Sequence, residues 1–156
     1  MEILVVGGGG REHAIIKKLK ENSEITKIYA LPGNGGMTQD AECVPIGATD
    51  LDGIVRFAAE HKIGYAVVTP DDPLVLGCVD ALNEIGVPCF GPRKNAAIIE
   101  GSKAFSKNLM KQYGIPTARY EVFTERSAAL AYLETAPIPT VIKADGLALG
   151  KGVVIA

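Results

Sequence analysis

Residues 3–13 read ILVVGGGGREH, and this short sequence determines the class of fold that we expect. The aliphatic run at residues 3–6 predicts a strand buried on both faces, as in a parallel sheet. Apolar side chains then recur with helical spacing, which predicts a helix over residues 11–21. A buried strand that passes through a glycine-rich turn into a helix is the opening unit of an α/β fold.

The same alternation of strand and helix continues as far as residue 92. We expect Thr49 or Asp50 to cap a helix that begins at residue 51. Asp72 is expected to cap the next helix, with Pro73 at its first position. This order predicts an open, doubly wound parallel sheet. The further strands are expected at residues 25–31, 42–46, 65–68 and 87–90, and the helices over 51–61 and 74–85.

The second half of the chain has a different pattern. A strand at residues 140–144, a glycine-rich loop at 145–152 and a strand at 153–156 predict a hairpin. The last strand reaches the final residue, so we expect the chain to be a piece of a longer protein. Helices are expected over residues 94–100, 102–113 and 127–135, and an extended segment over 119–123.

The bulk composition excludes several classes of protein. A net charge of −2 over 156 residues gives no basic face for a nucleic acid. The three cysteines show no CxxC spacing, so we expect neither a zinc site nor a disulfide framework. No apolar run approaches the roughly 20 residues of a membrane helix, and the start lacks the pattern of a signal peptide. We therefore expect a cytoplasmic protein without membrane or nucleic-acid partners.

The glycine-rich turn is the first candidate site. Its backbone amides and the start of the following helix can approach an anion, and Arg11 can add a forked contact to phosphate. The alternative is a tight turn without a ligand. A dinucleotide site is disfavoured, because the GxGxxG spacing fails and the second strand ends at Leu31-Pro32 rather than at an acidic residue.

Two more loops follow predicted strands. Pro32-Gly33-Asn34 comes after the second, and Thr69-Pro70-Asp71 after the fourth. The carboxyl ends of parallel strands share one edge of a sheet, so these loops can converge with the glycine-rich turn on one ligand. Each loop alone also reads as an ordinary turn. We expect His13 and His61 to be structural or solvated rather than catalytic.

The loop at residues 145–152 is the last candidate. Its glycines leave backbone amides free to cover phosphates, and Lys143 and Lys151 can neutralise phosphate charge. It is not a P-loop, because Gly152 follows Lys151 where a Ser or Thr is required. The alternative is a flexible hairpin with two surface lysines.

Taken in order along the whole chain, these segments resemble the phosphoribosylamine–glycine ligases of the ATP-grasp superfamily. The resemblance implies a reaction in which ATP activates glycine as glycyl phosphate, which the amine of 5-phosphoribosylamine attacks to give glycinamide ribonucleotide. It implies ATP and Mg²⁺ as cofactors, with phosphoribosylamine and glycine as substrates. The segments that carry it are VVGGGGREHA, LPGNGGM, PDDPLVLGCVDAL, FGP, EGSKAFSK, GIPTARY and VIKADGLALGKGVVIA.

The resemblance also implies site residues, none of them a nucleophile or a metal ligand. Thr69-Pro70-Asp71 departs from the usual Gly-Pro-Glu, so the carboxylate of Asp71 has a shorter reach. Substrate binding is expected at Gly8, Gly9, Gly10, Arg11, Glu12, Pro32, Gly33, Asn34, Pro70 and Asp71. ATP binding is expected at Lys103, Lys143, Gly146, Gly150, Lys151 and Gly152.

The domain organisation that follows has three parts. Residues 1–92 are expected to form a substrate-binding α/β domain, 93–122 connecting helices at the start of the ATP-grasp domain, and 123–156 part of its lid. The Mg²⁺ ligands and the glycine site are expected outside this chain, so we expect the chain alone to be inactive. A non-catalytic module that binds a phosphosugar or nucleotide stays open as an alternative, and an NAD-dependent oxidoreductase is disfavoured.

Overall fold

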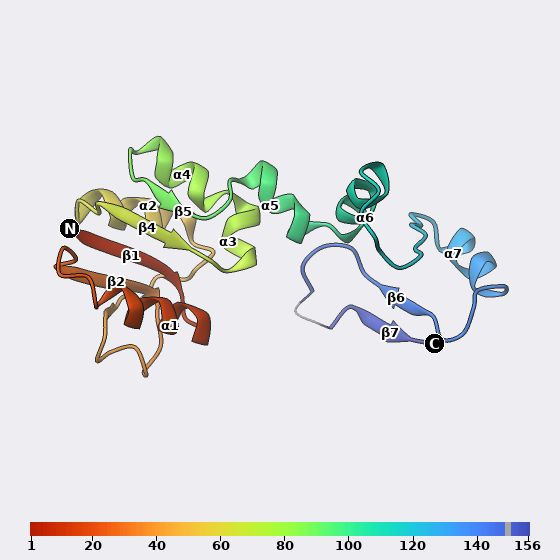
Figure 1. Ribbon diagram of the computed structural model, residues 1–156, viewed down its shortest axis with the longest axis horizontal. Coiled ribbons are helices and arrows are strands. Elements are labelled where there is room, and N and C mark those ends of the chain that lie inside the picture. The colour runs from red at the N-terminus through yellow and green to blue at the C-terminus, as the bar shows by residue number, and fades with distance from the viewer. Residues whose placement is uncertain (149–150) are drawn as a thin grey trace. The chain divides into compact units, whose positions relative to one another are not determined.

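The computed structural model describes residues 1–148 and 151–156, which divide into two compact units, Met1–Ala97 and Ile98–Ala156 (Figure 1). The first unit is built on a five-stranded sheet in the order β3-β2-β1-β4-β5. All four neighbouring pairs are parallel, which confirms the predicted α/β sheet. Its strands are β1 (Glu2–Gly7), β2 (Lys27–Pro32), β3 (Glu42–Cys43), β4 (Tyr65–Val68) and β5 (Cys89–Phe90).

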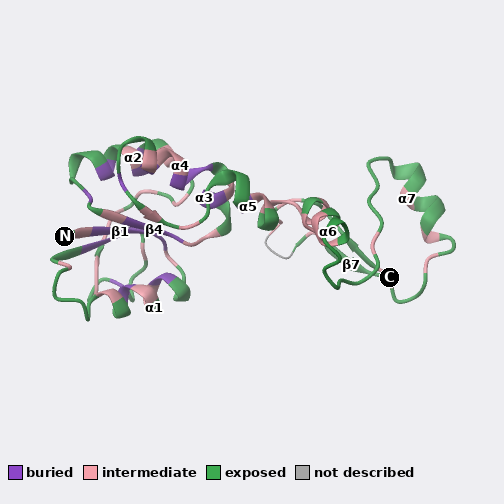
Figure 2. Cartoon of the chain, turned by 45° about the horizontal axis from the view of Figure 1, so that its top comes forward, coloured by how far each residue is buried: buried purple, intermediate pink, exposed green. Residues whose placement is uncertain are grey.

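Strand β1 is the centre of this sheet and is buried on both faces. Ile3 and Val5 belong to one apolar cluster, while Leu4 and Val6 belong to another. Helix α1 (Gly10–Leu19) covers the first face, and helices α2 (Leu51–Glu60) and α4 (Cys78–Glu84) cover the second (Figure 2). The sheet is therefore doubly wound, as the continuous aliphatic runs predict.

The helix ends show one confirmed cap and one error. Asp50 caps α2, where its Oδ1 accepts a hydrogen bond from the Gly53 N–H at 3.0 Å. The single helix expected over residues 74–85 is wrong. Helix α3 (Asp71–Leu76) begins earlier, with Pro70 at the N-cap, and a left-handed Gly77 (φ 99°) separates it from α4. Asp72 therefore lies in the first turn instead of capping the helix.

Two strands are about half as long as expected or less, and a third expected extended segment forms no strand. Strand β3 ends at Cys43 and β5 begins at Cys89, so each has only two residues. Both are edge strands, which the order of the sheet leaves with one neighbour each. The described residues 119–123 form no strand at all. An apolar or β-branched composition does not make a strand where no neighbouring strand is available to pair with it.

The second unit contains the predicted hairpin. Strands β6 (Val141–Lys143) and β7 (Val153–Ile155) pair antiparallel, with Val141 opposite Ile155. The helices are α6 (Lys103–Gln112), capped by Ser102 Oγ on the Phe105 N–H at 3.1 Å, and α7 (Arg126–Leu133). Helix α5 (Lys94–Gly101) runs across the boundary between the units. None of the described residues of this unit is buried, and both strands of the hairpin are exposed.

Across the described ranges, no helix is long and apolar enough to cross a membrane.

The centre of the sheet predicts where the first unit is most sensitive to mutation. Leu4 is fully buried, so Leu4→Ala should leave a cavity and lower the free energy of unfolding by about 2–5 kcal/mol. Leu76→Ala removes the same atoms from a side chain that is 48% exposed, and it should change that free energy by less than about 1 kcal/mol. Urea denaturation followed by circular dichroism measures both. Equal losses in the two variants would contradict the assignment of the core.

Candidate functional site

Three loops meet at the carboxyl edge of the first unit's sheet. They follow β1, β2 and β4, which are adjacent strands in the order β2-β1-β4. The backbone already joins two of them, because the Gly33 N–H donates to the Gly7 carbonyl at 3.2 Å. The convergence predicted for these loops is therefore present in the structure.

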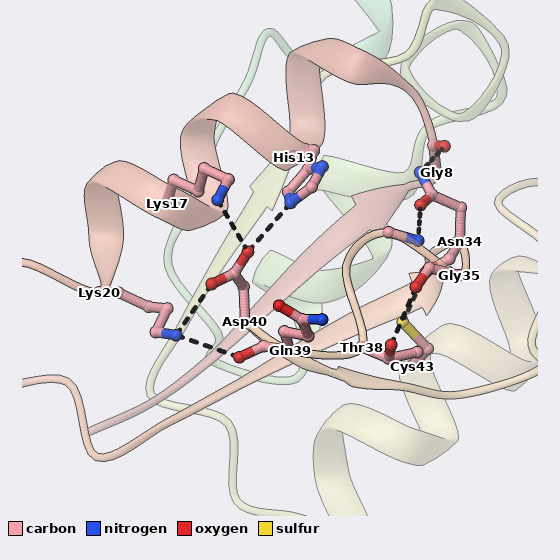
Figure 3. A network of polar contacts seen from close by, with 11 residues as sticks. Gly8, His13, Lys17, Lys20, Asn34, Gly35, Thr38, Gln39, Asp40 and Cys43 are labelled. Carbon is pink, nitrogen blue, oxygen red and sulfur yellow. Dashed lines mark hydrogen bonds and ion pairs between the residues drawn. The ribbon is translucent and has the colours of Figure 1, made fainter.

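Gly8 lies where two of these loops come closest. A Cβ built on Gly8 would lie 2.5 Å from the carbonyl oxygen of Gly33, so this position has no room for a side chain. Asn34 Nδ2 donates to the Gly8 carbonyl at 2.8 Å, and Asn34 Oδ1 accepts the Gly36 N–H at 2.7 Å (Figure 3). Asn34, expected as a substrate ligand, uses its amide to hold the two loops together.

Glu12 joins the glycine-rich turn to the loop after β4. Its Oε2 accepts the Gly9 N–H at 2.7 Å, and its Oε1 accepts the hydroxyl of Thr69 at 2.5 Å. The side chain is 3% exposed, and Arg11 Nε lies 3.6 Å from Oε1. Glu12 is also the third residue of α1, where a carboxylate that accepts the N-cap N–H stabilises the helix start.

Gly10 and Arg11 face open space at the same edge. A Cβ built on Gly10 would meet no atom within 4 Å, and the Arg11 side chain is 63% exposed. Both are the first residues of α1, so no helical carbonyl lies one turn earlier to accept a hydrogen bond from their backbone N–H groups. Arg11 and Thr69 also line an open cleft of about 580 Å³, which extends to Phe90, Gly91 and Pro92.

The remaining loop residues frame this edge. Pro32 is the last residue of β2 and is exposed, and Gly33 (φ 68°) turns the chain back beside Cys43. Pro70 packs against the turn, since a Cβ on Gly7 would lie 2.8 Å from its Cγ. Asp71 is exposed as the first residue of α3.

A cluster of basic side chains around Asp40 was not predicted from the sequence. Asp40 Oδ2 lies 3.0 Å from His13 Nε2 and 3.3 Å from Lys17 Nζ, and Oδ1 lies 2.9 Å from Lys20 Nζ (Figure 3). Hydrogen bonds from Lys20, His13 and Lys17 hold the pKa of Asp40 well below its ordinary range. The spacing of His13, Lys17 and Lys20 along one face of α1 is the signal that would have pointed to this cluster.

In the second unit, the loop after β6 is held on the start of α6. Asp145 Oδ1 accepts the Ala104 N–H at 3.1 Å, and its Oδ2 accepts the Ser102 hydroxyl at 2.9 Å. The Ala104 N–H, followed by the Ser102 hydroxyl, lowers the pKa of Asp145. Lys103 Nζ donates to the Gly146 carbonyl at 2.5 Å. The structure thus brings together Lys103 and Gly146, two of the residues expected to bind ATP.

The other residues expected at ATP lie along the hairpin. Lys143 is exposed at the end of β6, and Lys151 is exposed just before β7. Gly152 accepts the Ala144 N–H at 2.8 Å, and a Cβ on it would lie 3.0 Å from Ala144 Cβ. Gly150 lies outside the described residues.

Metal-ligand clusters and the thiols of Cys78 and Cys89 are two further kinds of candidate site. No group of three His, Cys, Asp or Glu side chains among the described residues is arranged to hold a metal ion. Burial raises the pKa of Cys78 to about 12 and that of Cys89 to about 11. Both thiols therefore stay protonated at neutral pH, and neither is suited to act as a nucleophile.

Two family models match the sequence in succession. Residues 1–100 match "Phosphoribosylglycinamide synthetase, N domain", and residues 101–156 match "Phosphoribosylglycinamide synthetase, ATP-grasp (A) domain". A phosphoribosylamine–glycine ligase of Allochromatium vinosum is 52% identical over 158 residues, and one of Halalkalibacterium halodurans is 52% identical over 156 residues. Each alignment covers 100% of this chain, which spans 37% and 36% of the two relatives' lengths.

Solved structures agree with these matches. The phosphoribosylamine–glycine ligase of Thermotoga maritima is 31% identical with a TM-score of 0.77, over 99% of this chain and 36% of that one. The biotin carboxylase domain of a 2-oxoglutarate carboxylase from Hydrogenobacter thermophilus, in complex with MgADP, has a TM-score of 0.79. It covers 99% of this chain and 37% of that one at 21% identity, so it supports the fold alone.

The close approach at Gly8 predicts a contrast between neighbouring glycines. Gly8→Ala should force the loops apart and lower the free energy of unfolding by about 1–3 kcal/mol, because its Cβ meets the Gly33 carbonyl. Gly10→Ala should be neutral or stabilising by up to about 1 kcal/mol, since it adds a methyl group in open space within a helix. Thermal unfolding of both variants checks this, and a Gly10→Ala variant less stable than Gly8→Ala would contradict it.

The cluster of basic side chains around Asp40 predicts that stability depends on pH. Because the pKa of Asp40 lies below its ordinary value of 3.8 in the folded chain, its ion pairs stabilise the fold above pH 3.8. That contribution should be lost as the pH falls below 3.8 towards the lowered pKa. The free-energy difference between the wild type and Asp40→Asn, measured by urea denaturation, should therefore shrink from about pH 6 to about pH 2.5. A difference that stays constant over that range would show that the ion pairs do not contribute.

Proposed function

We propose, because this chain belongs to the phosphoribosylglycinamide synthetase family, that it forms the N-terminal part of a phosphoribosylamine–glycine ligase. The observation that carries this proposal is the succession of the two family matches over residues 1–100 and 101–156. The whole enzyme would join glycine to 5-phosphoribosylamine at the expense of ATP, in the synthesis of purines. Relatives that carry this name are about half identical to the chain over its full length.

The carboxylate of glycine is a poor electrophile, so the reaction requires its activation. It does not require a nucleophilic side chain of the protein. The glycine carboxylate would attack the γ-phosphorus of ATP to give glycyl phosphate and ADP. The amine of phosphoribosylamine would then attack the carbonyl carbon, and phosphate would leave as the amide bond forms. The protein contributes by positioning the reactants and neutralising their charge. The described residues contain no cluster of three side chains that could hold a metal ion, so we assign no step to a metal ion in this chain.

The first unit is suited to hold the phosphoribosyl group. The exposed guanidinium of Arg11 and the backbone N–H groups that begin α1 are donors directed at the same open edge. A guanidinium can donate two parallel hydrogen bonds to a phosphate. The exposed carboxylate of Asp71 is an acceptor for ribose hydroxyls or for the amine of the substrate. We place the phosphate at Arg11 and Gly10, and the sugar towards Asp71.

The second unit is suited to contact the phosphates of ATP. Lys103 lies at the start of α6, next to the loop expected to cover the phosphates, and Lys143 is exposed at the end of β6. Two ammonium groups beside one loop are a suitable arrangement for neutralising a polyphosphate. A non-catalytic phosphosugar-binding module would use the same first unit without this lysine pair, so the pair favours the ligase.

Arg11 gives the most direct test of the substrate site. Arg11→Ala should weaken the binding of glycinamide ribonucleotide to this chain by tenfold or more, because a charge-assisted contact contributes about 1.5–3 kcal/mol. Isothermal titration calorimetry measures the affinity. Arg56→Ala, on helix α2, removes the same charge from an exposed position and should leave the affinity unchanged.

Three results would contradict the proposal in different ways. Equal affinity of the wild type and Arg11→Ala would remove Arg11 from the site. An equal loss in Arg56→Ala would show that net charge, and not the loop, determines binding. Saturable binding of NADH at micromolar concentration, with no binding of the ribonucleotide, would restore the dinucleotide alternative.

A further inference from the structure

Glu12 is the buried charged residue of the described chain, and its place is unusual. It lies 3% exposed beneath the glycine-rich turn, while the apolar clusters of the sheet lie on the two faces of the strands. A carboxylate is costly to remove from water unless its oxygens receive hydrogen bonds. Both oxygens of Glu12 do, from the Gly9 N–H and the Thr69 hydroxyl.

We infer that Glu12 is a positioning residue, which holds the glycine-rich turn and the loop after β4 at the separation that the phosphoribosyl group requires. It acts through its neighbours and does not touch the substrate itself. This inference rests on the proposed function, because it takes the edge beside Arg11 as the place where that group binds. It replaces the expectation from the resemblance that Glu12 contacts the substrate.

The geometry supports positioning over contact. Each carboxylate oxygen is already paired within the protein, and the side chain has almost no accessible surface through which a ligand could reach it. Its two partners come from two loops, and Thr69 lies 57 residues further along the chain than Glu12. One side chain therefore fixes the distance between segments that border the same cleft.

The packing around Gly7 shows how closely this arrangement fits. A Cβ on Gly7 would lie 2.7 Å from Glu12 Cγ and 2.8 Å from Pro70 Cγ. Gly7 also has φ 125°, a conformation that side chains rarely adopt. The turn thus leaves space for the Glu12 side chain to pass under it and for Pro70 to close against it. A purely local helix cap would need only the contact to Gly9.

The charge of Glu12 provides a test with a clear sign. A carboxylate close to a bound phosphate repels it, so if charge alone mattered, Glu12→Met would tighten binding. Methionine has a similar length but no carboxylate oxygens, so it cannot receive the hydrogen bonds from the Gly9 N–H and the Thr69 hydroxyl. If Glu12 positions the loops, the same substitution should weaken binding.

The experiment measures the affinity of this 156-residue chain for glycinamide ribonucleotide by isothermal titration calorimetry. Glu12→Met should raise the dissociation constant roughly ten- to a hundredfold, since a small displacement of binding groups has effects of that size. Thr69→Val removes the hydroxyl that Glu12 accepts and should have the same direction of effect. Thr69→Ser keeps the hydroxyl and should restore nearly wild-type affinity.

A matched control separates positioning from loss of stability. Asp50→Ala removes the cap of α2 without touching these loops, and it should leave the dissociation constant unchanged even where it lowers the melting temperature. Amide hydrogen exchange adds a second readout, because the Gly9 amide should exchange faster in Glu12→Met and not in Asp50→Ala.

Each outcome either supports or contradicts the inference. Weaker binding in Glu12→Met and Thr69→Val, with normal binding in Thr69→Ser and Asp50→Ala, supports the inference. Unchanged or tighter binding in a folded Glu12→Met overturns it and leaves the proposed function standing. If Glu12→Met does not fold, normal binding in Thr69→Val overturns it instead. No binding of the ribonucleotide by the folded wild type contradicts the proposed substrate site, and the inference falls with it.

Discussion

The arrangement of the first unit depends on the central position of β1 between two parallel neighbours. Its pairing with β2 and β4 fixes where three loops leave the sheet, and both of its faces are occupied by apolar clusters. A shift of one residue in this register would exchange the two faces of β1. The aliphatic run therefore sets the fold and also the place of the candidate site, because the ends of these strands bring their loops to one edge.

Convergence alone does not make the loops a site, since they must also be held at defined separations. Glycine allows one kind of contact: Gly8 lets the backbone approach the Gly33 carbonyl. Polar side chains supply the other kind, with Asn34 joining the first two loops and Glu12 joining the first to the third. The result is a rigid edge from which Arg11 extends into solvent. Preorganisation of this kind lowers the entropy that a ligand must lose on binding.

Local patterns in the sequence predicted the elements better than the roles of the polar residues. Strand β4 was predicted with its observed bounds, because four apolar residues between turn signals leave few alternatives. The single helix over 74–85 was wrong, because one left-handed glycine, Gly77, divides it. The sequence shows which side chains gather at an edge but not which of them pair with each other. Asp40 was missed for that reason, since its partner His13 lies 27 residues away.

The two units use acidic residues in the same way. Glu12 accepts an N–H at the start of α1 and the hydroxyl of Thr69, and Asp145 accepts an N–H at the start of α6 and the hydroxyl of Ser102. Each carboxylate partly neutralises the positive end of its helix. The start of each helix therefore attracts a phosphate less strongly than the neighbouring glycine-rich segment would suggest. In the sites proposed above, the adjacent cation, Arg11 in one unit and Lys103 in the other, would therefore supply most of the attraction for an anionic ligand.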